Sequence, residues 1–536
     1  MEACSVPGPA YTIMPNQKVR SRTAGRRKSA RISKPFKPSS AILNVVSSLQ
    51  ALVEHHEAWD VDHEDQLLHK LEQLLSKLRA LQESDEECVI PTRTTESFNT
   101  FSRWLSSNGL NLDDMPYRID FIPGSEVKDA TLFATRDIEN DEVIMSVPST
   151  VLFSADKSPI KVLEDIMPAL RTMPSLALAL HLLSEASKPG SHFRPYIDTL
   201  PSIFTTPFAN FSPQHLLSLR PSHASAAAIK SLRAQVRNYT YIYQAVLSLR
   251  PQILSPRVLT FSNFVWALSV VMTRQNALPI SEPPTMALVP LWDLCNHEPG
   301  HYTTQVLVHE SITVECRAMR SFKAGDPVTI FYGPRPNEKL LLFSGFVHPD
   351  NAYDTIPVSL PISRSDPLSP LKARALSKMG VDVQLATVST PTSEEGVGKS
   401  WLCNVVVGRG VIGEALAVAR VLAMDKGALT DWLKRGAYLP ERAAVDSSAE
   451  EDAKAQVAEA VRSKLRLYNS LQEDGNESPN ALHNRTAEVR ELLLSEKRLL
   501  ELDLEVLQRE EDDEQSNVLC VEDVDQCHCC DAYRPA

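Results

Sequence analysis

Three short segments of the sequence contain residue types that could bind a ligand or do chemistry. They are VMTRQNALP from residue 271, WDLCNHEPG from residue 292 and IFYG from residue 330. The guanidinium of Arg274 can bind a carboxylate through two parallel hydrogen bonds. The amides of Asn276 and Asn296 offer both donors and an acceptor, and the hydroxyl of Tyr332 can orient a reacting atom. Each type also has an ordinary structural use, Arg274 at a helix end and Tyr332 in the core of a strand.

His297, taken alone, suggests a catalytic base or a metal ligand. We discount both roles because the neighbouring sequence has no partner carboxylate motif and no second histidine at metal-ligand spacing. Cys295 follows an apolar strand and is expected to be a small buried residue. Near the C-terminus, Cys527-His528-Cys529-Cys530 is too tightly spaced for separate ligands of one tetrahedral zinc ion. The sequence therefore predicts no metal site.

The segments that must position these residues alternate between helix-rich and strand-rich stretches. Residues 41–82 carry a helical stripe of leucines, which favours a helix packed on the neighbouring domain over a coiled coil. Short strands follow between residues 120 and 154, with DIENDE (137–142) as a turn. Residues 160–250 are helical again, and strands return from about 287 to 345. Strands that are interrupted and then resumed predict a β core split by a helical insertion.

Helical patterns dominate from residue 368 onward. Residues 446–474 are charged and rich in alanine, a turn is expected at Asp474-Gly475-Asn476, and residues 487–509 have leucines on one face. These features predict an α+β chain whose C-terminal part is dominated by helices.

The two ends of the chain carry opposite charge. The net charge of -12 argues against nucleic-acid binding, except through a local basic arm at residues 18–37. An acidic run occupies residues 510–514. Both ends lack the apolar residues that would order them, so we expect disordered tails. The basic tail is a nuclear address, an electrostatic docking arm, or a solvated tail with no dedicated partner.

Cysteine usage and apolar runs bear on the compartment. The nine cysteines are odd in number and irregularly spaced, which favours a reducing environment over a disulfide framework. No apolar run is long enough to span a membrane. The start, MEACSVPGPAYTIMP, lacks the charged and then apolar pattern of a secretory signal. We expect a cytoplasmic protein with some access to the nucleus.

Four segments, in this order and spacing, resemble the SET-domain methyltransferases of the Rubisco-methyltransferase type. They are FATRDIENDEVIMSVP (133–148), FRPYIDTLPSIFTTP (193–207), VMTRQNALP through LVPLWDLCNHEPG (271–300) and IFYGPRPNEKLLLFSGF (330–346). The likeness extends over roughly residues 90–505. It implies a knotted, β-rich SET core with a helical insertion, an all-helical substrate-binding domain, and S-adenosyl-L-methionine as the cofactor.

The resemblance sets expected domain boundaries. They are a basic tail over residues 1–40, a helical region over 41–110, a SET domain over 111–350 with its insertion at about 160–260, a substrate-binding domain over 351–509, and an acidic tail over 510–536.

The resemblance also assigns roles to residues. Tyr332 matches the active-site tyrosine of the family, whose hydroxyl can orient the attacking nitrogen or contact the methyl group through weak C–H···O bonds. His297 is expected to hold the cofactor through its backbone. The implied cofactor-binding residues are Arg274, Asp293, Leu294, Cys295, Asn296, His297, Ser344, Gly345 and Phe346.

Within the family the likeness is strongest to the branch that methylates histidine in actin. Asn276, Trp292, Tyr332 and Arg335 all match that branch, which implies actin as the protein substrate. Imidazole is mostly neutral at pH 7, so the chemical difficulty is the choice of tautomer. An amide such as Asn276 can bond one ring nitrogen and leave the lone pair of the other free. Trp292 and Tyr332 could then enclose the ring.

The sequence departs from the family at two places. Asp129-Ala130-Thr131 stand where SET domains usually have Gly-x-Gly, whose backbone closely approaches the cofactor. We expect Asp129 to repel the cofactor carboxylate unless Lys128 offsets its charge. The position of a second cofactor-binding arginine falls at Thr94, with Arg93 beside it.

Two other functions stay open from the sequence alone. One is a protein-lysine methyltransferase acting on a histone or another protein. The other is a catalytically weak SET-like module that binds a partner through its C-terminal domain, and its support is the missing Gly-x-Gly.

Overall fold

The computed structural model describes fourteen stretches of the chain, all in one compact unit that starts at Pro38. The described stretches are residues 38–54, 63–83, 86–122, 129–155, 168–207, 212–249, 254–308, 312–362, 366–378, 380–388, 398–408, 412–435, 445–473 and 486–508. Residues 1–37 of the predicted basic tail, the predicted acidic tail, Lys128, the turn at 474–476 and the cysteines at 527–530 lie outside the described residues. The last residue of the predicted basic tail, Ser40, instead begins the first helix.

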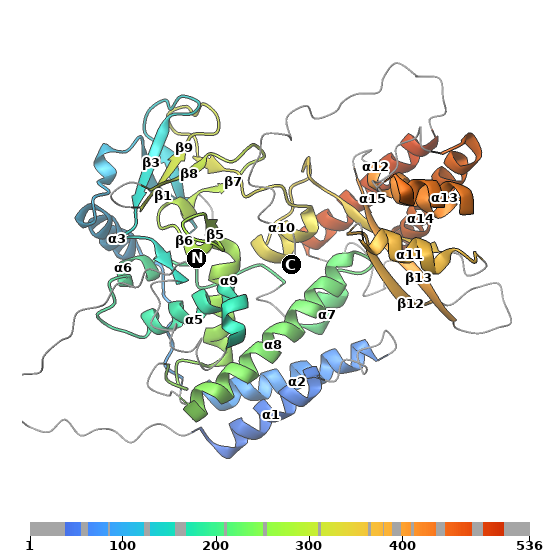
Figure 1. Ribbon diagram of the computed structural model, residues 1–536. Coiled ribbons are helices and arrows are strands. Elements are labelled where there is room, and N and C mark those ends of the chain that lie inside the picture. The colour runs from blue at the N-terminus through green and yellow to red at the C-terminus, as the bar shows by residue number, and fades with distance from the viewer. Residues whose placement is uncertain are drawn as a thin grey trace, which may run out of the picture. The chain divides into compact units, whose positions relative to one another are not determined.

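Three helices precede the SET core: α1 (Ser40–Glu54), α2 (Glu64–Glu83) and α3 (Thr95–Ser107). The predicted stripe of leucines on α2 is buried, with Leu71 and Leu78 fully inaccessible. Helix α1 packs against both α2 and the long helix α8 (His223–Leu249), as Figure 1 shows. The stripe therefore packs on the neighbouring domain, as predicted.

The β core joins strands from both sides of the insertion. Strand β3 (Val143–Pro148) pairs with β9 (Ile312–Arg317), and β4 (Phe153–Ser154) pairs with β6 (Thr285–Leu288). The predicted split core is thus confirmed. The remaining pairings are β1 (Tyr117–Phe121) with β2 (Ala130–Ala134), β5 (Gln275–Leu278) with β6, and β8 (Thr304–Val308) with β9.

The insertion is helical, as expected, because its sequence has apolar residues at helical spacing. Its elements are η4 (Pro168–Thr172), α5 (Pro174–Ala186), α6 (Arg194–Ile197), α7 (Pro213–Leu217), α8 and α9 (Phe261–Arg274). Helices α5 and α9 pack together, and most of their residues are buried. The insertion therefore contributes to the same hydrophobic core as the strands.

A short parallel pair lies beside these sheets. Strand β7 (Asn296–His297) pairs with β10 (Thr329–Ile330), and η5 (Trp292–Leu294) leads into β7. Helix α10 (Asn337–Ser344) follows. This pairing brings the second and third segments of the sequence motif together.

The C-terminal region is mainly helical but also contains a sheet that the all-helical prediction missed. Strand β13 (Gly398–Val407) lies between β11 (Ile356–Ile362) and β12 (Asp382–Val388). In β11 every second residue is buried, the period of a strand with one face packed. Its two prolines hide that pattern in the sequence. The helices of the region are α11 (Ser369–Lys378), α12 (Gly413–Ala423), α13 (Lys426–Lys434), α14 (Ser447–Glu473) and α15 (Ala487–Gln508).

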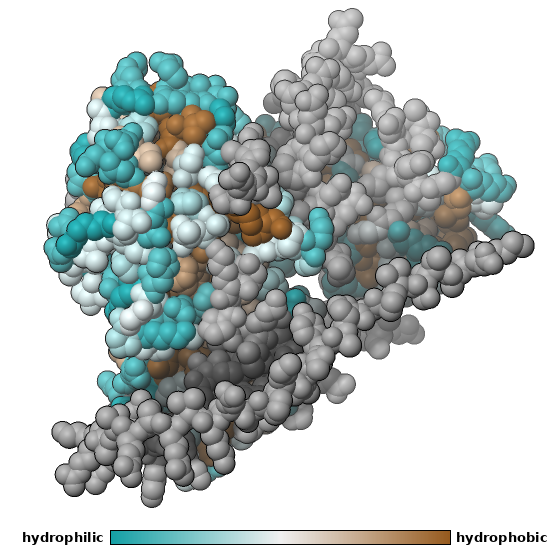
Figure 2. Space-filling model, turned by 60° about the vertical axis from the view of Figure 1, so that its left-hand side comes forward, coloured by the Kyte–Doolittle hydropathy of each residue, from teal (hydrophilic) through white to brown (hydrophobic). Residues whose placement is uncertain are grey.

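The α+β prediction is confirmed by these elements. On the face drawn in Figure 2 the described surface is mostly hydrophilic, with hydrophobic areas between. Among the described helices, none has the length and apolar character needed to cross a membrane.

Candidate active site

Helix α9 delivers Arg274 to the site at its last residue. Thr260 caps the start of α9 by accepting a hydrogen bond from the backbone N–H of Asn263, and nearly all of the helix is buried. The chain passes from Arg274 directly into β5, so the side chain is fixed at the junction of a helix and a strand. Nη1 of Arg274 donates to Oγ1 of Thr273 at 2.6 Å, and the guanidinium lies 5.9 Å from the ring centre of Phe204.

The parallel pair β7–β10 places Tyr332 beside the segment Asp293–His297. The Tyr332 hydroxyl donates to the carbonyl oxygen of Cys295 at 2.8 Å, and its backbone N–H donates to Nδ1 of His297 at 3.2 Å. Burial raises the pKa of Tyr332 to about 12, so the phenol keeps its proton at neutral pH. The residue is therefore a fixed hydrogen-bond donor.

His297 is held in its neutral form. Because its Nδ1 accepts a hydrogen bond, the ring proton is on Nε2. Burial, followed by the neighbouring His348, lowers the pKa of His297 to about 4. Its ring centre lies 5.1 Å from that of Tyr332 and 5.7 Å from that of Phe346. His297 is thus part of an aromatic group with Tyr332 and Phe346.

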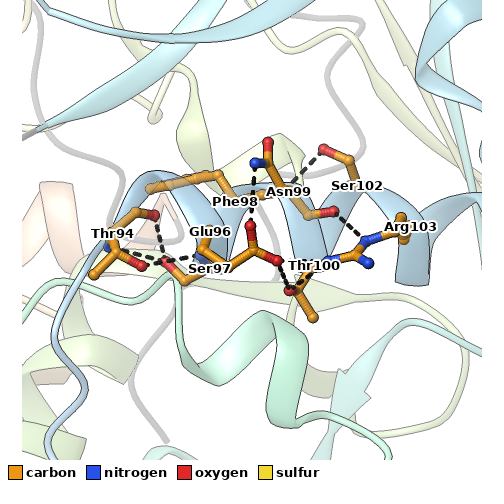
Figure 3. Close-up of polar contacts among 8 residues, drawn as sticks. All are labelled: Thr94, Glu96, Ser97, Phe98, Asn99, Thr100, Ser102 and Arg103. Atoms are coloured by element: carbon orange, nitrogen blue, oxygen red, sulfur yellow. Dashed lines mark hydrogen bonds and ion pairs between the residues drawn. The ribbon is translucent and has the colours of Figure 1, made fainter.

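Thr94, which the sequence aligned with a cofactor-binding arginine, caps helix α3 instead. Its Oγ1 accepts from the N–H of Ser97 at 3.0 Å, and its own N–H donates to Oγ of Ser97 at 3.0 Å (Figure 3). This reciprocal pair is a capping box, which fixes where the helix starts. The residue before the cap, Arg93, consequently turns into the protein and is 9% exposed.

Arg93 joins Arg274 in a buried group of charges. Its Nε donates to the carbonyl of Thr199 at 2.7 Å, and its Nη1 lies 3.4 Å from Oδ1 of Asp129. Burial, and then the positive charge of Arg274, lower the pKa of Arg93 to about 10. The guanidinium of Arg93 therefore stays charged at neutral pH. Asp129, expected to repel an incoming carboxylate, instead faces a cation.

Asp293 completes this group. The hydroxyl of Tyr196 donates to Oδ2 of Asp293 at 2.5 Å, and burial raises the pKa of this carboxyl above its usual value. The positive charges of Arg274 and Arg93 act to lower the pKa of Asp293 and so partly oppose the effect of burial. The predicted cofactor residue Asp293 is thus bound to the insertion helix α6 through Tyr196, and it faces the two arginines from the other side.

Thr131 uses its hydroxyl where the family usually has glycine. The side chain is 1% exposed, and Oγ1 donates to the carbonyl oxygen of Leu294 at 3.0 Å. The residue links β2 to the η5–β7 segment. The Asp129–Thr131 stretch is therefore built into the site by a side-chain hydrogen bond rather than by glycine flexibility.

Helix α10 ends at the predicted cofactor residues Ser344, Gly345 and Phe346. Gly345 adopts a φ of 83°, and a Cβ there would lie 2.5 Å from Oγ1 of Thr205, so only glycine fits. Thr205 also donates to the Gly345 carbonyl at 3.2 Å. Within the described part of the chain, the buried Oγ of Ser344 has no hydrogen-bond partner. A buried unpaired hydroxyl is costly unless a ligand satisfies it.

The predicted substrate residues differ in their surroundings: Asn276 lies on a strand, Trp292 lies in the core, and Arg335 lies near Tyr332 and His297. Asn276 lies on β5, where Nδ2 donates to the carbonyl of Arg274 at 3.1 Å. Trp292 is 4% exposed and belongs to the hydrophobic core. Arg335 lies close enough for its positive charge to affect both rings. It slightly opposes the effect of burial on the pKa of Tyr332, and it adds to the lowering of the pKa of His297. Arg335 and Tyr332 are thus brought together, and a substrate contact by Trp292 stays a prediction.

Comparisons with known proteins agree with this geometry. The family model described as SET domain matches residues 130–333, and the one described as Rubisco LSMT substrate-binding matches residues 363–500. A protein named actin-histidine N-methyltransferase from Mus musculus is 34% identical over 292 residues, which is 53% of this chain and 48% of that protein. The chain spans about half the length of the curated relatives it matches. The chain therefore contains a SET domain followed by a Rubisco LSMT substrate-binding domain.

Solved structures of Rubisco LSMT share the fold of this SET-domain protein. A crystal structure of the SET domain of LSMT bound to lysine and AdoHcy has a TM-score of 0.54 and 21% identity, and it covers 77% of this chain and 91% of that chain. Rubisco LSMT bound to AdoMet has a TM-score of 0.51 and 21% identity over 77% and 92% of the two chains. The molecules bound in these structures, AdoHcy and AdoMet, agree with the prediction that S-adenosyl-L-methionine is the cofactor.

The SET-domain site has the groups that S-adenosylmethionine needs. Arg93 and Arg274 can hold the carboxylate of its amino-acid part, because a guanidinium binds a carboxylate through two parallel hydrogen bonds and Arg93 is buried. Ser344 offers an unpaired hydroxyl, and Phe346 offers an aromatic face beside His297. The residues present therefore fit this cofactor. No group of three or more metal-ligating side chains occurs among the residues that the structure describes.

Sequence reasoning missed Tyr196 and did not choose Arg93. A signal for Arg93 was available, since Thr94 with Ser97 can form a capping box and a capping residue cannot also bind a ligand. Tyr196 carried no comparable local signal, because its contact with Asp293 joins positions 97 residues apart.

Proposed function

We propose that this protein transfers a methyl group from S-adenosylmethionine to a ring nitrogen of a histidine in actin. The observation that carries the proposal is the similarity to proteins named actin-histidine N-methyltransferase, at 34% identity over 292 residues for one of them. The amide of Asn276, the phenol of Tyr332 and the guanidinium of Arg335 support it, since these three are the polar side chains expected to contact the histidine.

When bound, the cofactor supplies an electrophilic methyl carbon on a sulfonium. The task of the protein is then to fix two reactants in line and to exclude water. Arg93 and Arg274 would bind the carboxylate of the cofactor, and Asn296, His297 and Phe346 are the other residues expected to hold it. Tyr332 remains protonated at neutral pH because its pKa is about 12. Its one proton is donated to the Cys295 carbonyl, so toward a substrate its oxygen can only accept a hydrogen bond, and it removes no proton.

Asn276 can select the reactive tautomer of the substrate histidine. Its Nδ2 is engaged with the Arg274 carbonyl at 3.1 Å, which turns Oδ1 into the group available as an acceptor. An imidazole N–H bonded to Oδ1 leaves the lone pair on the other ring nitrogen. A lysine ammonium would first have to lose a proton, since its usual pKa is near 10.4, and no base is provided by Tyr332 or by the neutral His297.

The direct test is incubation of the full chain with actin and methyl-labelled S-adenosylmethionine, followed by identification of the labelled residue by mass spectrometry. We expect the label on a histidine. In the variant Asn276→Phe we expect histidine labelling to fall at least about 10-fold, the effect of losing one well-placed hydrogen bond of about 1.4 kcal/mol.

Binding of S-adenosylhomocysteine to Asn276→Phe, measured by calorimetry, is the control for a damaged cofactor site. Label found on lysine alone would contradict the proposal and favour a protein-lysine methyltransferase. Absence of any cofactor binding by the unaltered chain would favour the protein-binding module.

A further inference from the structure

Two adjacent residues of α15 reach from the C-terminal domain to the SET domain. Oγ of Ser495 donates to Oδ2 of Asp354 at 3.1 Å. The carboxylate of Glu496 accepts from Oγ of Ser222 at 2.8 Å and from the hydroxyl of Tyr468 at 2.7 Å. All of these side chains are at most 5% exposed, so the contacts are buried polar links. We call them the Glu496 cluster.

The Ser495 link leads to helix α10. Asp354 accepts from the backbone N–H of Asn337, the first residue of α10, at 2.8 Å and from its side-chain Nδ2 at 2.7 Å. Figure 1 shows α10 next to α15, and the two helices are in contact. Helix α10 starts just after Arg335 and ends at Ser344. Its two ends therefore carry a substrate residue and a cofactor residue.

Several charged groups face Glu496. From α14 come Tyr468 and Lys464, whose Nζ donates to the carbonyl of Pro221 at 3.2 Å. The start of α8 contributes His223, whose Nδ1 is 3.2 Å from Glu338 of α10, and Asp354 adds a further carboxylate. One buried amine thus faces three carboxylates. Such an environment disfavours a charge on the most buried of them.

We propose that Glu496 is a positioning residue, through which the C-terminal domain fixes helices α8 and α10 and so places the cofactor-binding end of the SET site. The proposal rests on the proposed function, since α10 matters because Ser344 and Phe346 are expected to contact the cofactor. Burial disfavours the ionised form of Glu496, although the two hydrogen bonds that it accepts favour that form, so ionisation leaves an incompletely compensated charge at the junction.

The direction of the pH effect follows from burial. Burial raises the pKa of Glu496 to about 7, against 4.5 for an ordinary glutamate. Between these values the folded chain holds a proton that the unfolded chain has lost. The stabilising contribution of Glu496 is therefore complete below pH 4.5 and is lost as the pH rises through about 7. The junction is expected to loosen between pH 6 and pH 8.

The test compares the full chain with Glu496→Gln, which keeps the shape of the side chain and cannot ionise. The measurement is the Kd of S-adenosylhomocysteine by calorimetry at pH 6 and at pH 8. We expect the two proteins to bind alike at pH 6 and the unaltered chain to bind about 5-fold more weakly at pH 8, a modest coupling between sites. Glu501→Gln, on the exposed face of α15, should follow the unaltered chain.

A second variant, Tyr468→Phe, removes a donor whose hydrogen bond lowers the pKa of Glu496. The loss of affinity should therefore move to higher pH, and the Kd at pH 8 should lie closer to the Kd at pH 6 than it does in the unaltered chain. The proposal is overturned if the ratio of the Kd of the unaltered chain to the Kd of Glu496→Gln is the same at both pH values. A change in melting temperature with no change in Kd also overturns it. A chain that shows the pH response but leaves actin histidine unlabelled refutes the proposed function only. A chain that binds no S-adenosylhomocysteine overturns both.

Discussion

Tyr332 shows how one residue can join the two halves of the site. Its backbone N–H is bonded to His297 and its hydroxyl to the carbonyl of Cys295. Both partners lie in the segment after η5, so the phenol is held at two points. A donor fixed in this way needs little reorganisation during a reaction, which is the general advantage of a preorganised site.

The variant Tyr332→Phe removes the hydroxyl and keeps the ring. We expect kcat for actin to fall roughly 100-fold, as when a reacting group is displaced by about 1 Å. S-adenosylhomocysteine affinity should change little, because the ring contacts with His297 and Phe346 remain. Steady-state kinetics and calorimetry measure the two effects. Tyr353→Phe, at an exposed tyrosine, is the matched control, and an equal loss in it would refute a specific role for Tyr332.

Arg93 is expected to bind the cofactor together with Arg274. The variant Arg93→Gln should weaken S-adenosylhomocysteine binding roughly 10- to 100-fold, because a charge-assisted hydrogen bond contributes about 1.5–3 kcal/mol. Calorimetry measures the change, and the melting temperature checks for misfolding. Arg103→Gln, an exposed arginine on α3, should bind normally. Unchanged affinity in a folded Arg93→Gln protein would exclude Arg93 from the site.

At the scale of elements, helix ends place the two arginines. Arg274 is the last residue of α9, and Arg93 immediately precedes the cap of α3. Residues at helix ends have fixed backbone positions but leave the regular packing of the helix, so their side chains can reach a site. The capping box at Thr94 thus helps to fix the position of the Arg93 guanidinium in the candidate cofactor site.

Replacing Thr94 with alanine tests this connection. Loss of the cap should lower the free energy of unfolding by about 1 kcal/mol. Because the start of α3 can then fray, S-adenosylhomocysteine affinity should also fall by a few-fold. Urea unfolding and calorimetry give the two quantities. Ser106→Ala, near the other end of α3, should leave both nearly unchanged. A normal Kd in Thr94→Ala would show that the cap does not hold Arg93.

At the scale of the whole molecule, segments distant in sequence close one core. Strands before the insertion pair with strands after it, and the insertion supplies Tyr196 to Asp293. The C-terminal domain has its own buried ion pair, in which Arg420 of α12 donates to Glu450 of α14 at 2.6 Å. It also contacts the SET domain through the Glu496 cluster. The site consequently depends on docking of the C-terminal domain as well as on the SET core.

The sequence alone indicated the SET-domain likeness, the helical insertion and most of the candidate site residues. Arg274, Tyr332 and the segment Asp293–His297 could be identified because they lie in short, ordered motifs. The helices could be placed because their apolar spacing is a local property.

Only the tertiary structure decided which arginine enters the site, what Thr131 does, and how α15 meets α10. The Thr131 hydroxyl bonds a carbonyl 163 residues away, and the sheet β11–β13–β12 depends on partners separated by a helix. Such contacts follow from the register and packing of elements that are far apart in the chain, and no local pattern encodes them. The sequence predicted that Asp129 would repel the cofactor carboxylate. In the fold its carboxylate lies 3.4 Å from the guanidinium of Arg93, a contact that no local pattern shows.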